Sequence, residues 1–249
     1  MDNIAARLEQ IEEKIEAACS RSGRKRHEVK LMAVSKFQPL ETVEAAYKAG
    51  VRLFGEARVQ EGKEKFSKFW EKHSRDESLE LHLIGSLQRN KAKTAASFFD
   101  CIQSVDRDSL IDELGALTVN REFPLMVMLE YRTGEETKAG FSGMDSLFRA
   151  AEKVLSFTGL RPVGLMTMAP FTDNETEIRL SFRKLVRARD ELEKRFPNRH
   201  EGSGNSIGSD GSCELWSCLS MGMTNDYSIA IEEGSNLIRI GTAIFGHEI

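Results

Sequence analysis

The chain has 249 residues, 40% of them hydrophobic, so it is long enough to bury one large core. Its formal net charge of -4 excludes the basic excess that is typical of nucleic-acid-binding proteins. The four cysteines form no CxxC pair and stand at no metal-ligand spacing, so neither a metal site nor a disulfide framework is predicted. Residues 1–16 lack the apolar run of a signal peptide, and no apolar span of membrane length follows, so we expect a cytoplasmic protein without a membrane partner.

Short apolar runs alternate with longer amphipathic segments along the chain. The first segment, Ile4–Ala18, has apolar residues at helical spacing, and we expect this helix to cover the bottom of the fold. The expected strands are residues 30–35, 52–55, 81–85, 101–105, 125–130, 162–168, 214–220 and 237–240. The expected helices between them are residues 40–49, 58–70, 89–98, 107–119, 144–157, 175–196 and 226–231.

Strands that are separated by helices require a parallel sheet with right-handed crossovers. Eight such units favour a closed barrel over an open sheet. The sequence therefore predicts one α/β domain over residues 1–249, a (β/α)8 TIM barrel with an extra N-terminal helix.

One stretch, residues 201–212, is rich in glycine and serine and interrupts this alternation. It cannot bury enough apolar surface to offset the entropy of ordering itself, which predicts a mobile surface loop. A phosphate-binding loop is the alternative, but these glycines match no known phosphate or dinucleotide fingerprint.

Lys36 follows the apolar run Leu31–Ser35, which places an amine at the carboxyl end of a predicted buried strand. Burial disfavours the ammonium form of a lysine, so a buried amine would be a nucleophile toward an aldehyde. This pattern indicates a Schiff base. The alternative is a lysine that extends from the strand end into water.

Hydroxyl and glycine residues follow the last two predicted strands, namely Ser220, Gly222, Gly241 and Thr242. In TIM barrels the loops after strands seven and eight commonly bind phosphate, because glycines let the backbone approach and hydroxyls donate to phosphate oxygens. Ordinary turn chemistry is the alternative for each loop taken separately.

Arg239 interrupts the apolar run Leu237–Ile240 with a charged group that needs a buried partner. The partner could be the pyridine nitrogen of a ligand or a structural carboxylate. An aldehyde-binding lysine, a phosphate site and a cation facing a ring nitrogen together indicate pyridoxal 5'-phosphate (PLP) rather than a phosphosugar.

The sequence resembles the pyridoxal phosphate homeostasis proteins, a family of single barrels similar to the N-terminal domain of alanine racemase. The matching segments follow one another through nearly the whole chain, at residues 31–36, 54–61, 81–91, 104–106, 136–140, 164–167, 219–223 and 239–246. The resemblance implies a cofactor held as a Schiff base on Lys36, with Arg239 near the pyridine nitrogen. It also implies that Ser220 and the loops of Gly222, Gly241 and Thr242 bind the phosphate, and that Met166 and His82 line the pocket.

The resemblance further implies a carrier or buffer of PLP that serves intracellular PLP homeostasis and passes the cofactor to PLP-dependent acceptor enzymes. We expect the protein to be a monomer. We expect no efficient catalysis, because racemisation needs an acid/base group on each face of the cofactor, and the chain ends at Ile249, soon after the eighth strand. A guanidinium also cannot readily give a proton to the ring nitrogen. The alternatives are a weak PLP-dependent enzyme of racemase or deaminase type and a lysine-dependent aldolase.

The sequence departs from the family pattern at Ala57 and Tyr131, where the family usually has asparagine. We hypothesise that Tyr131 fills the space at Ala57 and supplies its hydroxyl as a substitute donor to the cofactor.

Overall fold

The computed structural model describes residues 4–73, 79–134, 139–197 and 214–246. The expected loop of residues 201–212 lies outside these ranges. The strands are β1 (Lys30–Val34), β2 (Leu53–Glu56), β3 (Glu80–Leu83), β4 (Cys101–Val105), β5 (Leu125–Glu130), β6 (Leu160–Met166), β7 (Cys218–Ser220) and β8 (Leu237–Ile240). The helices are α1 (Ile4–Arg21), η1 (Arg26–Glu28), α2 (Leu40–Lys48), α3 (Val59–His73), η2 (Arg89–Lys91), α4 (Ala92–Phe98), α5 (Asp108–Thr118), α6 (Met144–Leu155), α7 (Glu175–Arg195), α8 (Tyr227–Glu232) and α9 (Thr242–Phe245).

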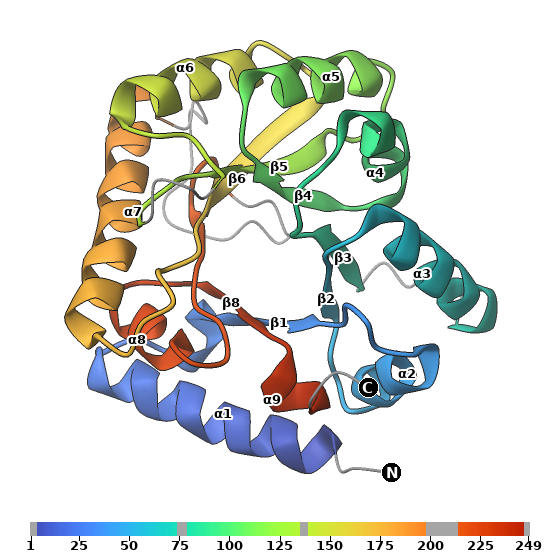
Figure 1. Cartoon of the computed structure of the whole chain (residues 1–249), viewed down its shortest axis with the longest axis vertical. Helices are drawn as coiled ribbons and strands as arrows, with labels where there is room; N and C mark the ends of the chain where they lie inside the picture. The colour runs from blue at the N-terminus through green and yellow to red at the C-terminus, as the bar shows by residue number, and fades with distance from the viewer. Residues whose placement is uncertain (1–3, 74–78, 135–138, 198–213, 247–249) are drawn as a thin grey trace.

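The strands form a closed parallel barrel in chain order, from β1 to β8. Closure is made by four register pairs between β1 and β8, in which Met32 stands opposite Arg239. Figure 1 looks down this barrel and shows the helices as a ring around it. The predicted TIM barrel is confirmed.

Two apolar layers hold the barrel together, because successive side chains of a strand point to opposite faces. Ala33, Phe54 and Ile238 belong to the large core between the strands and the helices. Met32 and Leu237 belong to a smaller cluster in the barrel interior. The carboxyl ends of all eight parallel strands meet at one end of the barrel, the mouth, where functional groups of this fold are found.

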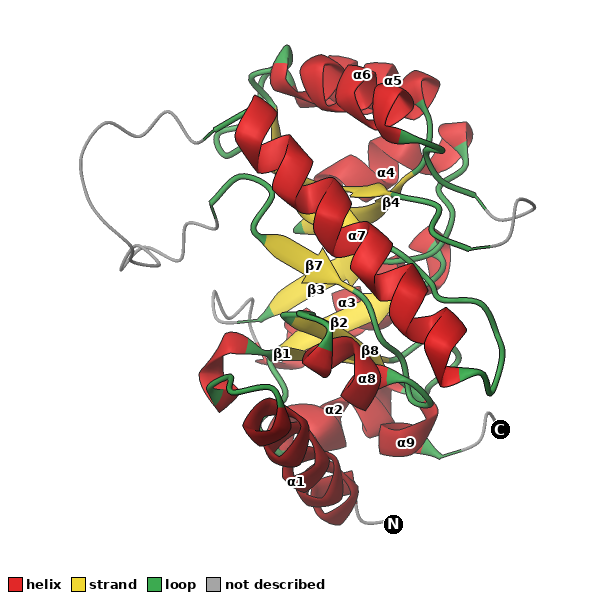
Figure 2. Ribbon diagram, turned by 90° about the vertical axis from the view of Figure 1, so that its left-hand side faces the viewer, coloured by secondary structure: helices red, strands yellow, loops and turns green. Residues whose placement is uncertain are grey.

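Helix α1 lies beside the barrel rather than across its bottom, so the expected position of this helix is wrong (Figures 1 and 2). It packs against α8 and α9. Its Arg7 side chain donates a hydrogen bond to the carbonyl of Ile244. The reason is steric, since α9 has only 4 residues and leaves a place in the helix ring that α1 fills.

The expected seventh strand, residues 214–220, is reduced to Cys218–Ser220. The backbone turns at Trp216, whose φ of 63° does not fit a strand, while its indole is fully buried. None of the described helices combines the length and the apolar character needed to cross a membrane.

Candidate functional site

Lys36 lies at the mouth, two residues beyond the end of β1, in the turn that leads into α2. Its side chain is exposed, and Nζ stands 5.7 Å from the ring centroid of Phe37. The expected burial of this amine is therefore wrong, because the strand ends at Val34 and the chain turns outward. Phe37 adopts a φ of 61°, which is rare for a bulky residue and marks a locally constrained turn.

A buried ion pair supports this turn from below. Lys65 of α3 donates to the Glu56 carboxylate at 2.9 Å and to the carbonyl of Ser35 at 2.6 Å. The Ser35 hydroxyl donates to the same carboxylate at 2.7 Å. The amide of Phe37 donates to Glu61 at 2.5 Å. Burial raises the pKa of the Glu56 carboxyl, and Lys65 opposes that rise. The backbone on both sides of Lys36 is thus held by a buried network.

The loops after β7 and β8 lie side by side at the mouth. The Thr242 hydroxyl donates to that of Thr224 at 3.2 Å, and a Cβ at Gly241 would meet the Val34 carbonyl at 3.4 Å. Gly222 has a φ of +95°, and a Cβ there would stand 2.5 Å from that of Ala230. Only glycine fits this position. The structure brings three of the four residues expected to bind phosphate, Gly222, Gly241 and Thr242, to the end of the barrel that carries Lys36.

Arg239 is buried in the barrel interior. Its guanidinium donates to the Ser220 hydroxyl at 2.7 Å and to the Thr167 carbonyl at 2.8 Å. Burial lowers the pKa of Arg239 to about 10, with Asp226 and Glu130 opposing the change, so the group stays charged at neutral pH. Within the described ranges no carboxylate forms an ion pair with it. Of the two partners that the sequence left open, a structural carboxylate is therefore not in direct contact with Arg239, and neutral oxygens accept its hydrogen bonds instead.

Ser220 is fully buried at the end of β7 and is already hydrogen-bonded within the protein. Its hydroxyl donates to Gln103 of β4 at 2.6 Å while accepting from Arg239. Met166 lies in the interior apolar cluster, and His82 is buried between Glu80 and Gln103. These expected site residues share the barrel interior, below the mouth.

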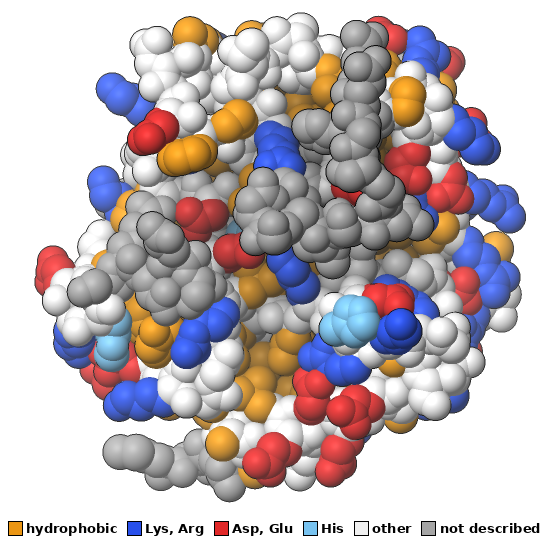
Figure 3. Space-filling view, turned by 180° about the vertical axis from the view of Figure 1, so that it is seen from behind, with side chains coloured by type: hydrophobic (Ala, Val, Ile, Leu, Met, Phe, Trp, Pro, Cys, Tyr) orange, Lys and Arg blue, Asp and Glu red, His pale blue; other side chains and the backbone are white. Residues whose placement is uncertain are grey.

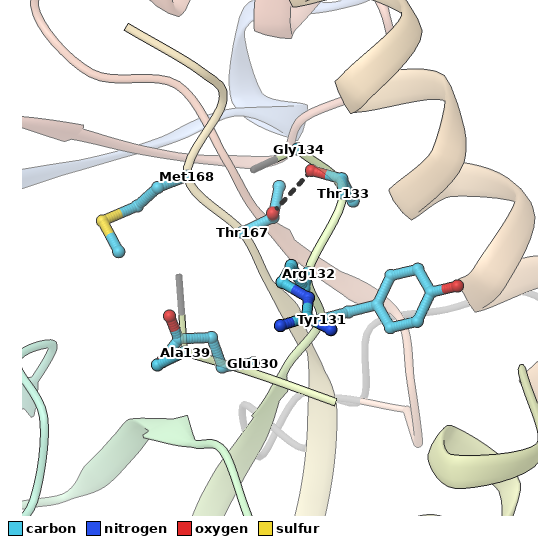
Figure 4. Close-up of a pocket in the computed structure, with 8 residues that line it drawn as sticks. All are labelled: Glu130, Tyr131, Arg132, Thr133, Gly134, Ala139, Thr167 and Met168. Carbon is cyan, nitrogen blue, oxygen red and sulfur yellow. Dashed lines mark hydrogen bonds between the residues drawn. The ribbon is translucent and has the colours of Figure 1, made fainter. Parts of the chain in front are cut away.

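A small pocket at the carboxyl ends of β5 and β6 adds a residue that the sequence analysis missed (Figure 4). Glu130 ends β5, lines this pocket and is 5% exposed. Burial raises the pKa of its carboxyl to about 7, with Asp106 adding to the rise and Arg239 opposing it. A carboxyl that closes a buried strand repeats the pattern that drew attention to Lys36, so the signal was present in the sequence.

Tyr131 does not fill the space beside Ala57, so the hypothesis of a substitute donor is wrong. Figure 4 shows its ring pointing away from the pocket toward a neighbouring helix. Its hydroxyl contacts Met144 Sδ at 3.9 Å, and its ring packs against the outer core. The physical reason is strand alternation, which turns Tyr131 outward when the preceding residue, Glu130, lines the pocket.

A larger groove lies at the opposite end of the barrel, between α1 and the residues that precede β2. Its volume is about 650 Å³. Figure 3 shows hydrophobic side chains in this hollow, with acidic side chains along one edge. The acidic groups include Glu9, Glu12 and Glu16 of α1. Because this groove lies at the amino ends of the strands, the mouth remains the candidate site.

The chain is similar to known proteins in both sequence and structure. Residues 6–248 match the family model described as alanine racemase, N-terminal domain. A pyridoxal phosphate homeostasis protein of Haemophilus influenzae is 37% identical over 98% of this chain and 95% of its own length. A protein of the same name from Aquifex aeolicus is 35% identical over 98% of both chains. The structure of PipY from Synechococcus elongatus with PLP bound superposes with a TM-score of 0.79 at 30% identity, covering 98% of this chain and 100% of PipY.

Proposed function

Because the chain belongs to the pyridoxal phosphate homeostasis protein family, we propose that it binds PLP at the barrel mouth and takes part in PLP homeostasis. The observation that carries the proposal is the buried guanidinium of Arg239, whose hydrogen bonds within the described residues go only to neutral oxygens, while Asp226 and Glu130 act on its charge without bonding to it. A cation held this way favours a ligand that brings an acceptor or a negative charge into the interior.

The residues at the mouth fit this cofactor in chemistry. Lys36 supplies an exposed primary amine, which an aldehyde can reach directly from solvent. Gly222 and Gly241 leave the backbone without side chains at the same end of the barrel, and the exposed Thr242 hydroxyl is a donor for a phosphate oxygen. We propose that Lys36 holds PLP as a Schiff base, that these loops hold its phosphate, and that Arg239 faces its ring nitrogen.

The exposed position of Lys36 supports a carrier rather than a catalyst. When bound, PLP supplies a reactive aldehyde and an electron-withdrawing ring. Arg239 keeps its protons at neutral pH, so it does not protonate the ring nitrogen, and the ring is a weak electron sink. An amine exposed at the mouth also lets water or a second amine release the aldehyde. We therefore propose reversible binding and delivery to PLP-dependent acceptor enzymes, without efficient turnover.

Borohydride reduction tests this proposal, because it fixes an imine as a stable secondary amine. Peptide mapping by mass spectrometry of PLP-loaded, reduced protein is expected to find the pyridoxyl group on Lys36. In Lys36→Ala the label should disappear, and the dissociation constant for PLP should rise at least about tenfold. Lys68→Ala, which removes an exposed lysine, is the matched control and should change neither the label on Lys36 nor the dissociation constant for PLP. A label on another lysine in the wild-type protein contradicts the assignment, and absence of any label contradicts PLP binding through an imine.

Turnover is tested separately on the same material. Chiral chromatography of amino acids incubated with PLP-loaded protein is expected to show no racemisation above that of free PLP. Racemisation that requires Lys36 would instead establish an enzyme of racemase type.

A further inference from the structure

A chain of hydrogen bonds crosses the barrel interior and joins five polar side chains. Arg239 donates to the Ser220 hydroxyl at 2.7 Å, and this hydroxyl donates to Gln103 Oε1 at 2.6 Å. Gln103 Nε2 lies 2.8 Å from His82 Nδ1, and His82 Nε2 lies 3.1 Å from the Glu80 carboxylate. The contact between Gln103 and Ser220 connects β4 with β7, so the chain spans the lumen.

The direction of every bond in this chain follows from the donor-only guanidinium at one end and from the amide of Gln103, whose oxygen faces Ser220 and whose NH2 group faces His82. A guanidinium can only donate, so Ser220 accepts from Arg239 and gives its single proton to the oxygen of Gln103. The amide of Gln103 then turns its NH2 group to His82, so Nδ1 of the imidazole accepts. The ring proton therefore sits on Nε2 and is donated to Glu80. In this arrangement His82 is neutral.

This direction matters because it commits the only proton of Ser220 to Gln103. Protonation of His82 would make Nδ1 a donor, and Gln103 would then have to turn its oxygen toward the imidazolium. The NH2 group of Gln103 would face Ser220, whose hydroxyl would accept from Gln103 and Arg239 together. Its proton would become available to an anionic ligand oxygen.

We propose that Gln103 is a positioning residue that couples ligand binding at Ser220 to proton uptake by His82. The inference rests on the proposed binding of PLP at Ser220 and Arg239. By linkage, a ligand that takes the Ser220 proton favours protonated His82, and its affinity falls as pH rises and His82 becomes neutral.

The charged groups around His82 come from three strands. Glu80 of β3 accepts from it, and the hydrogen bond from His82 holds the pKa of Glu80 at about 2, so this group is a carboxylate throughout the neutral range. Lys30 of β1 lies 3.6 Å from the same carboxylate. Arg239 of β8 acts through Ser220 and Gln103, and Cys101 of β4 is the register neighbour of His82.

Two substitutions of Gln103 that keep the side chain at a similar length test the coupling. Gln103→Met can neither accept the Ser220 proton nor bond to His82, so it should free the hydroxyl and abolish the coupling. Gln103→Glu can accept from both neighbours, so it should hold the Ser220 proton inward at every pH and weaken PLP binding. The dissociation constant for PLP is measured by absorbance from pH 6 to 9 on protein stripped of cofactor. We expect the ratio of the wild-type dissociation constant to that of Gln103→Met to rise about tenfold as the pH is raised over this range. The ratio cancels the pH dependence of PLP and of Lys36.

Nuclear magnetic resonance of the wild-type protein gives a second measurement that needs no variant to bind ligand. The chain has 5 histidines, and the signal of His82 is assigned by its loss in His82→Gln. In stripped protein we expect the tautomer protonated at Nε2, and PLP should move the midpoint of the His82 titration upward by about one pH unit. A proton on Nδ1, or a midpoint that PLP leaves in place, overturns the inference. If PLP is then still fixed on Lys36 by borohydride, the proposed function stands without the coupling.

Discussion

Replacing Glu130 by glutamine is expected to stabilise the protein by an amount that depends on pH. The Glu130 carboxyl is 5% exposed, and burial raises its pKa from 4.5 to about 7 even with Arg239 opposing the change. At about 1.4 kcal/mol per pH unit, this difference corresponds to about 3 kcal/mol of unfolding free energy.

The sign follows from which state binds the proton. Below pH 4.5 Glu130 is protonated in both states and costs nothing. Between pH 4.5 and about 7 the unfolded chain has lost this proton while the folded protein keeps it, so rising pH lowers the unfolding free energy. Above about pH 7 the Glu130 carboxyl is ionised in both states, and the full free-energy cost of burying its charge is present. Glu130→Gln stays neutral and escapes this cost.

Urea unfolding followed by circular dichroism from pH 5 to 9 measures the effect. The advantage of Glu130→Gln over wild type should grow from below about 1 kcal/mol at pH 5 to about 3 kcal/mol at pH 8. Glu64→Gln is the matched control, because its pair with Lys68 is exposed and should contribute less than about 0.5 kcal/mol. Parallel stability curves for Glu130→Gln and wild type would refute the reasoning.

Three further changes test the packing around the mouth. Gly222→Ala should lower the unfolding free energy by about 3 kcal/mol, because it adds backbone strain and a close contact with α8. Gly23→Ala, where a Cβ would meet nothing within 4 Å, should lower it by only about 1 kcal/mol. Equal urea midpoints for these two variants would contradict this prediction. Lys65→Met leaves a buried carboxylate unpaired and should cost about 3 kcal/mol in the same assay, against less than about 0.5 kcal/mol for the exposed Lys68→Met. Tyr131→Phe should change the dissociation constant for PLP less than about twofold, because its hydroxyl points away from the pocket, and a larger loss measured by absorbance would return this tyrosine to the site.

The sequence predicted the barrel because each strand is covered on both faces and therefore reads as a short apolar run between amphipathic helices. It could not place the end of β1, since Ser35 and Lys36 continue the run without a turn signal, and the exposed lysine was expected to be buried. Strand alternation would have predicted that Tyr131 faces outward if Glu130 had first been assigned to the pocket.

Sequence patterns could not predict the contacts across the barrel interior. Gln103 and Ser220 are separated by 117 positions and meet only after the barrel closes. Neither residue carries a local signal for the other, because spacing arguments extend over one helix face or one strand pair. Arg239 was visible as an anomaly within its strand, but its neutral partners depend on the same closure.

The packing of α1 has a consequence for how the protein is made. This helix is made before the barrel strands, yet its main neighbours are α8 and α9, and the hydrogen bond between Arg7 and Ile244 spans 237 positions. Its apolar face therefore stays uncovered until α8 and α9 have been made. Such distant pairing slows folding, since a long loop must close before the contact forms. We expect nascent chains halted before β8 to expose this face and to be targets for chaperones.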